Sequence, residues 1–222
     1  MLTKVYYFLH RLVSRPEEKN EPSKGYWQDK ARQEALSLSA RATGRLLEIG
    51  CGEGLFLIQL AKQNPRLELW GIDHNEKMLS RAKERFLKDN LENIHIGNQK
   101  AENTTLQDGF FDTVACINVF INMRSLENVK SILAQMKRLC KPSGKIIFDF
   151  RNALNPLLVL KYKLAKYYDE TVKNYPLSTF YPKQIEKILK DLNFTITEKR
   201  FIGFRIKKFA PIITIEAQKN AD

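Results

Sequence analysis

The chain runs Leu46-Leu47-Glu48-Ile49-Gly50-Cys51-Gly52-Glu53-Gly54, and this stretch decides its fold. Its first half is typical of a buried strand, and the three glycines at every second position predict a tight turn that leads into a helix. A second apolar run, residues 67–72, ends in Asp73. A strand, a glycine turn, a helix and a strand that ends in an acid predict one nucleotide-binding half of a doubly wound sheet.

The glycine turn and Asp73 together predict a site for an adenosine-containing cofactor. Glycine has no Cβ and adopts positive φ readily, so the turn lets the backbone come close to a ligand. The carboxylate of Asp73 can accept hydrogen bonds from both hydroxyls of a ribose.

The spacing of the turn favours adenosylmethionine over a dinucleotide. The dinucleotide fingerprint is Gly-x-Gly-x-x-Gly, whereas this turn is Gly-x-Gly-x-Gly and is followed by Leu55. Glu53 lies inside the turn, where we expect it to repel a phosphate. Adenosylmethionine has no phosphate, and its positive sulfonium and amino group tolerate a nearby acid. A nicotinamide-dependent oxidoreductase is therefore the least favoured enzyme class.

With this turn, and with further segments in the same order, the chain resembles the class I S-adenosylmethionine-dependent methyltransferases of the small-molecule type. The resemblance covers residues 45–150 and, more weakly, residues 180–219. The matching segments are the third strand Ile94-His95-Ile96-Gly97, the adenine-facing loop Asn98-Gln99-Lys100-Ala101-Glu102, the fourth strand at residues 109–118 with its Phe-Asp-x-Val opening, and the turn at residues 139–145 before the fifth strand.

The fold that we expect is α/β: a Rossmann-like, doubly wound, seven-stranded sheet, mostly parallel, with helices on both faces. Strands and helices alternate through the core, which predicts crossover connections between parallel strands. Two late strand-like runs, residues 195–204 and 212–217, have no helix between them and predict an antiparallel C-terminal hairpin. The resemblance implies the same seven strands.

We expect a single domain, residues 1–222, in four parts. Residues 1–44 form an N-terminal helical cap, residues 45–150 the cofactor-binding core, residues 151–182 a substrate lid insertion, and residues 183–222 the C-terminal helix and hairpin. The length suits one buried core.

The resemblance also implies the residues that hold the cofactor. The glycines would bind its methionine part, Asp73 its ribose, the Ala101 amide its adenine, and the carbonyl near Asn118 its amino group. Arg32, in an expected helix over residues 27–40, would pair with its carboxylate. The full set is Arg32, Glu48, Gly50, Cys51, Gly52, Gly54, Asp73, His74, Lys100, Ala101 and Asn118.

One residue of this set departs from the family pattern. Similar proteins often have Asp before the alanine, where it accepts a hydrogen bond from the adenine amino group. Here the residue is Lys100, which cannot accept. Gln99 is the candidate to replace that contact.

No catalytic residue is assigned, because in-line methyl transfer mainly requires alignment and desolvation, and a general base is optional. Asp149 and Arg151, at the end of the fifth strand, either contact substrate or serve the structure. The three cysteines, Cys51, Cys116 and Cys140, have neither metal-site nor disulfide spacing, so we expect no metal and a reduced, cytoplasmic setting.

The net charge of +12 is concentrated outside the core, since residues 45–150 carry only +2 of it. The excess is either a solvated basic surface or a surface for an anionic partner: an acidic substrate, a membrane or nucleic acid. Residues 1–15 form a basic amphipathic pattern that either caps the domain or lies on an anionic membrane. We therefore expect a cytoplasmic protein with peripheral membrane association as one option; no stretch is long and apolar enough to span a bilayer.

The leading functional hypothesis is an adenosylmethionine-dependent methyltransferase that acts on a small-molecule or lipid-like acceptor by in-line transfer. The alternatives are an RNA or DNA methyltransferase, which the basic flanks would suit, and a non-catalytic cofactor-binding protein on the same fold. The sequence Asn118-Val119-Phe120 lacks the proline pair of the amino-methylating nucleic-acid enzymes. The acceptor and the oligomeric state stay open.

Overall fold

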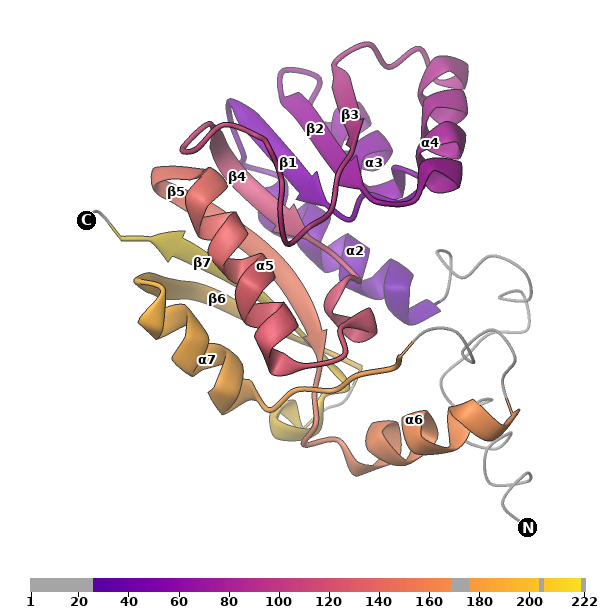
Figure 1. The fold of residues 1–222 in the computed structure, drawn as a ribbon, viewed down its shortest axis with the longest axis vertical. Helices are drawn as coiled ribbons and strands as arrows, with labels where there is room; N and C mark the ends of the chain where they lie inside the picture. Colours follow the sequence, from indigo (N-terminus) through magenta and orange to yellow (C-terminus); the bar gives the residue numbers. More distant parts are fainter. Residues whose placement is uncertain (1–25, 169–175, 204–205, 221–222) are drawn as a thin grey trace.

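A computed structural model describes residues 26–168, 176–203 and 206–220. Its centre is a seven-stranded sheet in the order β3-β2-β1-β4-β5-β7-β6 (Figure 1). Strand β7 runs antiparallel to both of its neighbours, and the other pairs are parallel. The strands are β1 Arg45–Ile49, β2 Glu68–Asp73, β3 Ile94–Asn98, β4 Phe111–Cys116, β5 Cys140–Arg151, β6 Phe194–Ile202 and β7 Ile212–Lys219. The predicted fold class is confirmed.

Helices cover both faces of the sheet (Figure 1). They are α2 Tyr26–Ser39, α3 Leu55–Gln63, α4 Glu76–Lys88, α5 Leu126–Leu139, α6 Pro156–Tyr168 and α7 Pro182–Asp191, with short 3₁₀ helices η3 Phe120–Asn122 and η5 Lys207–Phe209. Side chains of α5 and α7 share one buried hydrophobic cluster, and those of α2, α3 and α4 share another. This separation follows from the apolar stripes of the helices, which each bury one side against the central strands.

The start of β5 differs from the expected strand at residues 145–150. The chain passes from α5 directly into the strand at Cys140, which pairs with Phe111. The register then shifts, because Thr113 pairs with Lys145. The expected turn is therefore a bulge inside the strand, and Ser143 has a φ of 58° within it.

The strand order reverses between β1 and β4, and this reversal places the functional site. Strands β2 and β3 extend the sheet to one side of β1, whereas β5 follows β4 on the other side. In open α/β sheets, ligands bind in the crevice at the carboxyl ends of the strands at such a switch point. The glycine turn after β1 and Asn118 after β4 both lie at this edge.

Some predictions fall on residues that the structure does not describe. The basic amphipathic helix at residues 1–15 lies outside the described residues, and so does part of the expected lid, residues 169–175. No helix within the described part of the chain combines the length and the apolar character needed to cross a membrane.

Candidate functional site

The glycine turn is tied to the end of β2 by backbone and carboxylate hydrogen bonds. The amides of Gly50 and Cys51 donate to the carbonyl of Ile72, at 2.7 and 3.0 Å. Asp73 accepts from the Gly52 amide through Oδ2 and from the Asn75 amide through Oδ1, both at 2.9 Å. A carboxylate offers about four lone-pair sites, so Asp73 keeps acceptor capacity for a ligand hydroxyl.

The three glycines of the turn all have left-handed backbones, but for two different reasons. Their φ angles are 75° at Gly50, 51° at Gly52 and 73° at Gly54. A Cβ on Gly50 would lie 2.4 Å from Val119, and one on Gly54 would lie 2.5 Å from the ring of Phe86. A Cβ on Gly52 would meet nothing within 4 Å. Gly50 and Gly54 therefore serve packing, whereas Gly52 borders open space that a ligand can enter.

This difference predicts opposite results for Gly52→Ala and Gly54→Ala. Gly54→Ala adds a methyl group that clashes with the buried ring of Phe86. We therefore expect the free energy of unfolding to fall by about 2–4 kcal/mol, from overpacking and backbone strain together. Gly52→Ala carries only the backbone strain, of order 1 kcal/mol, yet its methyl group fills the open space. Urea unfolding and calorimetric titration with adenosylmethionine separate the two. A Gly52→Ala protein that binds like the wild type would contradict this assignment.

Glu48 is a buried acid with an unsatisfied oxygen beside the turn. The residue is 4% exposed, and its Oε2 has no hydrogen-bond partner among the described residues. Burial raises the pKa of Glu48 well above its ordinary value; the positive charge of Arg32 opposes this shift, and the charge of Asp73 adds to it. An orphaned buried acceptor fits a cationic group of a ligand, such as the amino group of adenosylmethionine.

Arg32 and Glu53 have protein partners of their own. Arg32 is 7% exposed and pairs with Asp29 of its own helix at 3.1 Å, so its role toward a cofactor carboxylate stays a prediction. Glu53 pairs with Arg81 and Arg85 of α4, at 2.8 and 2.9 Å. Its negative charge is thus balanced within the protein, and the expectation that it repels a phosphate is not supported. The preference for adenosylmethionine depends instead on the spacing of the turn and on Glu48.

The adenine-facing loop keeps the predicted departure from the family. Lys100 is exposed, and its backbone forms an isolated antiparallel β-bridge with that of Asn103. Ala101 is half-buried against the core. The side-chain oxygen of Gln99 accepts from the hydroxyl of Thr104 and, at 2.9 Å, from the amide of Thr105. Gln99 therefore uses its acceptor within the loop, and the proposal that it replaces the missing acid is not supported.

His74 is exposed beside the site, whereas Cys51 is buried. The side chain of His74 is 74% exposed, and its Nδ1 lies 3.5 Å from Oδ1 of Asp73. Cys51 is buried, and burial raises the pKa of its thiol well above the ordinary value. A protonated, buried thiol is a poor nucleophile.

A buried polar network joins the ends of β4 and β5 to two helices. Arg151 donates to Asp149 Oδ2 at 2.5 Å and to Asn118 Oδ1 at 3.0 Å. The Asn118 amide donates to Asp149 Oδ1 at 2.6 Å, and its side chain donates to the carbonyl of Gln28 in α2 at 3.0 Å. Arg151 also hydrogen-bonds the hydroxyl of Tyr162 in α6, whose pKa burial raises.

This network decides between the two roles that the sequence left open for Asp149 and Arg151. The side chains are 1% and 2% exposed and satisfy each other, so they hold the crevice together rather than reach a substrate. Tyr162 was missed by sequence reasoning, because nothing in its segment signals a partner in a distant strand. Asn118 has a φ of 61°, which orients its backbone and side chain into the network.

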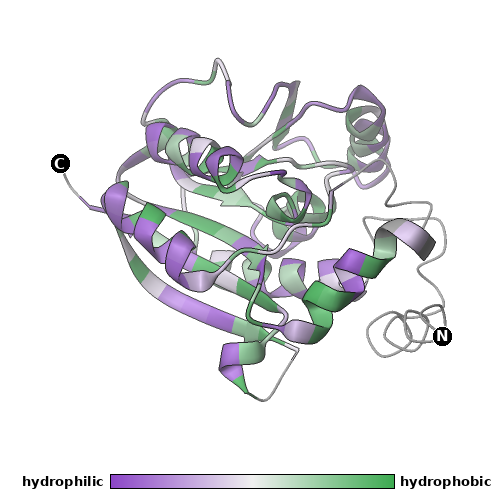
Figure 2. Cartoon of the chain, turned by 60° about the horizontal axis from the view of Figure 1, so that its bottom comes forward, coloured by the Kyte–Doolittle hydropathy of each residue, from purple (hydrophilic) through white to green (hydrophobic). Residues whose placement is uncertain are grey.

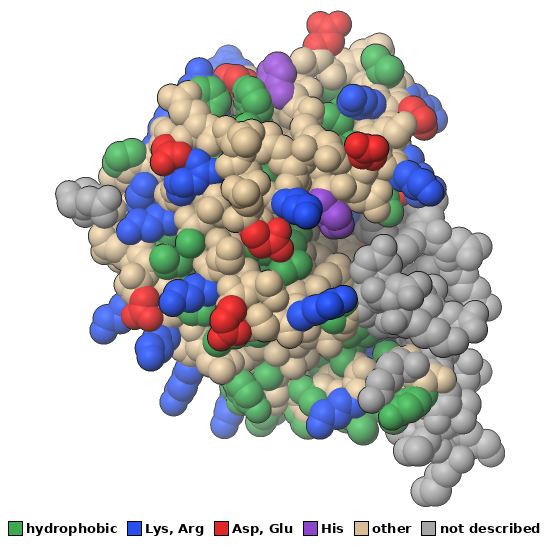
Figure 3. Space-filling model, viewed as in Figure 1, with side chains coloured by type: hydrophobic (Ala, Val, Ile, Leu, Met, Phe, Trp, Pro, Cys, Tyr) green, Lys and Arg blue, Asp and Glu red, His purple; other side chains and the backbone are tan. Residues whose placement is uncertain are grey.

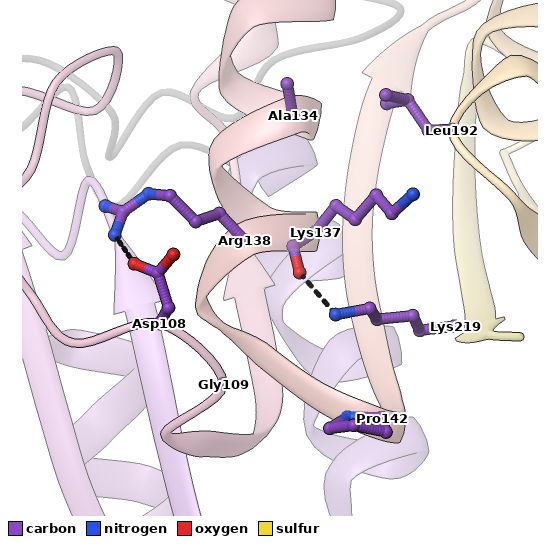
Figure 4. A pocket seen from close by; sticks show the side chains of 8 residues that line it. All are labelled: Asp108, Gly109, Ala134, Lys137, Arg138, Pro142, Leu192 and Lys219. Atoms are coloured by element: carbon purple, nitrogen blue, oxygen red, sulfur yellow. Dashed lines mark hydrogen bonds and ion pairs between the residues drawn. The ribbon is translucent and has the colours of Figure 1, made fainter. Parts of the chain in front are cut away.

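One pocket of the described part of the chain lies away from this site. It has a volume of about 430 Å³ and is lined by residues of the α5 C-terminus, the loop before β4 and the end of β7 (Figure 4). Arg138 pairs there with Asp108, and Lys219 donates to the carbonyls of Lys137 and Cys140. The pocket lies at the amino ends of β4 and β5, opposite the glycine turn, so its cations serve the fold.

Metal and disulfide chemistry find no support in the described residues. No group of three or more His, Cys, Asp or Glu side chains within them is placed to hold a metal ion. The three cysteines are buried and free.

Part of the chain is similar in sequence to known methyltransferases. Residues 46–144 match the family model described as a methyltransferase domain. Phosphatidylethanolamine N-methyltransferase of Cereibacter sphaeroides is 30% identical over 139 residues, which cover 61% of this chain and 65% of that protein. The ubiquinone/menaquinone biosynthesis C-methyltransferase UbiE of Burkholderia mallei is 31% identical over 121 residues, or 54% and 48% of the two chains. This chain thus spans less than two thirds of the length of either relative.

One solved structure of similar fold is that of a methyltransferase with bound SAH. The magnesium protoporphyrin IX methyltransferase of Synechocystis PCC 6803, solved with bound SAH, superposes with a TM-score of 0.68. The match covers 87% of this chain and 84% of that one, at 22% sequence identity. At this identity the likeness concerns the fold.

Proposed function

We propose that this chain, which belongs to the class I S-adenosylmethionine-dependent methyltransferases, transfers a methyl group from adenosylmethionine to a small-molecule or lipid-like acceptor. The observation that carries the proposal is the glycine turn at the switch point of the sheet. Gly52 borders open space there, Asp73 fixes the turn, and Glu48 keeps an unsatisfied buried oxygen beside it.

In this proposal, each residue of the site binds a different part of the cofactor. The bound cofactor supplies a methyl group on a positive sulfonium, which makes the carbon electrophilic. Asp73 accepts hydrogen bonds from the ribose hydroxyls with its remaining lone pairs. Glu48 accepts a hydrogen bond from the positive amino group through its unsatisfied oxygen, and Gly52 lets the backbone approach the methionine part.

The rate enhancement in this proposal comes from alignment and exclusion of water. The network of Asn118, Asp149 and Arg151 fixes the ends of β4 and β5, and through Gln28 and Tyr162 it holds α2 and α6 beside the crevice. We propose that α6 acts as the substrate lid. A rigid, dry crevice holds the acceptor in line with the methyl group, which is the main requirement of this displacement.

The names of two relatives support the proposed acceptor class. The two curated relatives are named for phosphatidylethanolamine and for ubiquinone and menaquinone biosynthesis. Both names indicate lipid-like acceptors. We propose an acceptor of this kind, whose nucleophile needs no dedicated base at the site.

A transfer assay with methyl-labelled adenosylmethionine tests this function. The protein is incubated with a total lipid extract, with a fraction of water-soluble metabolites, and with total RNA. We expect label in the lipid or small-molecule fraction, and none with Gly52→Ala. Label in RNA alone would contradict the proposed acceptor class. Cofactor binding without transfer to any fraction would contradict catalysis.

A further inference from the structure

Two segments at the lower end of the molecule leave large apolar side chains exposed. Within the described residues, four of the six exposed large apolar side chains lie on α6 or beside η5. Leu157 and Leu160 on α6 are 47% and 42% exposed, and Ile206, directly before η5, is 58% exposed. Figure 2, in which this end comes forward, shows apolar and hydrophilic residues interspersed along α6.

Two buried asparagines fix these segments side by side. Asn155 accepts from the Leu158 amide at 2.8 Å, at the start of α6, and donates to the carbonyl of Phe209 in η5 at 2.6 Å. Asn152 donates to the carbonyls of Lys208 and Ala210, both at 2.9 Å. Asn152 is 0% exposed and Asn155 is 4% exposed. Segments about fifty residues apart in the sequence therefore form one continuous surface.

The charges of this surface all have the same sign. Residues 152–168 and 206–212 contain five lysines and no acidic residue. Lys163, Lys207 and Lys208 are exposed. The ammonium groups of Lys207 and Lys208 lie 5.9 and 5.5 Å from the ring centres of Phe201 and Phe209. Figure 3 shows hydrophobic and basic side chains next to one another along this lower end.

We infer that this surface, defined by Leu157, Leu160, Lys163, Ile206, Lys207 and Lys208, docks on an anionic phospholipid membrane. Apolar side chains that enter the acyl boundary, ringed by lysines at the level of the headgroups, are what such a bilayer binds. The charge is complementary to anionic lipid over the whole patch. Exposed leucine and isoleucine favour a bilayer over nucleic acid, which has no apolar phase for them.

The docked orientation would bring the bilayer to the mouth of the crevice. Tyr162, on the same helix as Leu157 and Leu160, hydrogen-bonds Arg151 at the end of β5. Resting on the function proposed above, the surface then delivers an acceptor that resides in the membrane to the methyl-transfer site through α6.

Vesicle co-sedimentation of the full chain tests the electrostatic half of the inference. We expect the wild type to pellet at low salt with vesicles of phosphatidylglycerol and phosphatidylcholine, and not with phosphatidylcholine alone. Lys207→Gln with Lys208→Gln should lower the partition coefficient at least about tenfold, since each lysine near an anionic surface strengthens binding about fivefold. The matched control is Lys83→Gln with Lys88→Gln, which removes two exposed lysines of α4 at the other end of the molecule.

A second pair of variants tests the apolar half. Leu157→Gln with Leu160→Gln should weaken vesicle binding about tenfold at a salt concentration that screens the lysines. The matched control is Leu87→Gln. Leu87 is 79% exposed, and its helix α4 lies at the opposite end of the molecule from the proposed docking surface. None of the four variants, two test variants and two controls, changes the glycine turn. Their affinity for adenosylmethionine should therefore stay at the wild-type value.

Three results would overturn the inference: no wild-type binding to anionic vesicles, equal losses in the test and control variants, or tight binding to RNA with the same mutational pattern and none to vesicles. Vesicle binding by a wild-type protein that does not bind adenosylmethionine would leave the docking surface intact and refute the proposed function instead.

Discussion

Replacing Arg151 by methionine is expected to lower the free energy of unfolding by about 3–5 kcal/mol. Arg151 is buried and supplies the positive charge that faces Asp149, whose side chain is 1% exposed. Methionine fills a similar volume but leaves the carboxylate buried without a counter-charge. It also leaves the side-chain oxygen of Asn118 and the hydroxyl of Tyr162 without their shared donor.

Urea unfolding measures the effect, and a double variant identifies its cause. Asp149→Asn combined with Arg151→Met removes both charges, while the asparagine oxygen can still accept from the Asn118 amide. If the loss comes from the unpaired charge, the double variant should be more stable than Arg151→Met alone. A single variant that costs less than about 1 kcal/mol would show that the network does not hold the ends of β4 and β5.

Asp73→Ala is expected to weaken adenosylmethionine binding by about a hundredfold or more. Hydrogen bonds to a charged group are worth about 1.5–3 kcal/mol each, and the variant removes the acceptor proposed for both ribose hydroxyls. It also frees the amides of Gly52 and Asn75, which the carboxylate now ties together. Asp73→Asn keeps one acceptor oxygen and should show a smaller loss.

Asp112 offers a matched control for this variant. It too accepts from a backbone amide, that of Arg45 at 2.9 Å, but at the opposite end of β1. Asp112→Ala should lower thermal stability without changing calorimetric affinity for adenosylmethionine. Equal losses of affinity in the two variants would mean that Asp73 acts only through the fold.

The sequence was sufficient for the fold because its signals are local. Glycines at positions 50, 52 and 54, an acid at the end of the next strand, and alternating strands and helices each depend on neighbouring residues. The antiparallel C-terminal hairpin, formed by β6 and β7, is confirmed for the same reason. The bulge at Ser143 was not predicted, since it depends on how α5 meets the strand.

The parts of the site that depend on distant contacts could not be predicted in this way. From the sequence, Glu53 was expected to carry a free negative charge. In the structure, Arg81 and Arg85 of α4 pair with it. Gln99 looked like a free acceptor until Thr104 and Thr105 folded onto it. Partners of this kind are set by tertiary packing, which periodicity and spacing do not encode.

Calorimetric titration of the wild-type protein with adenosylmethionine, and with its demethylated product, tests the central claim most directly. The account predicts one site per chain with micromolar affinity for both compounds, and loss of both in Gly52→Ala while the protein stays folded. Absence of binding by either compound to the folded wild type would contradict the account. The glycine turn and Asp73 would then have to serve another ligand.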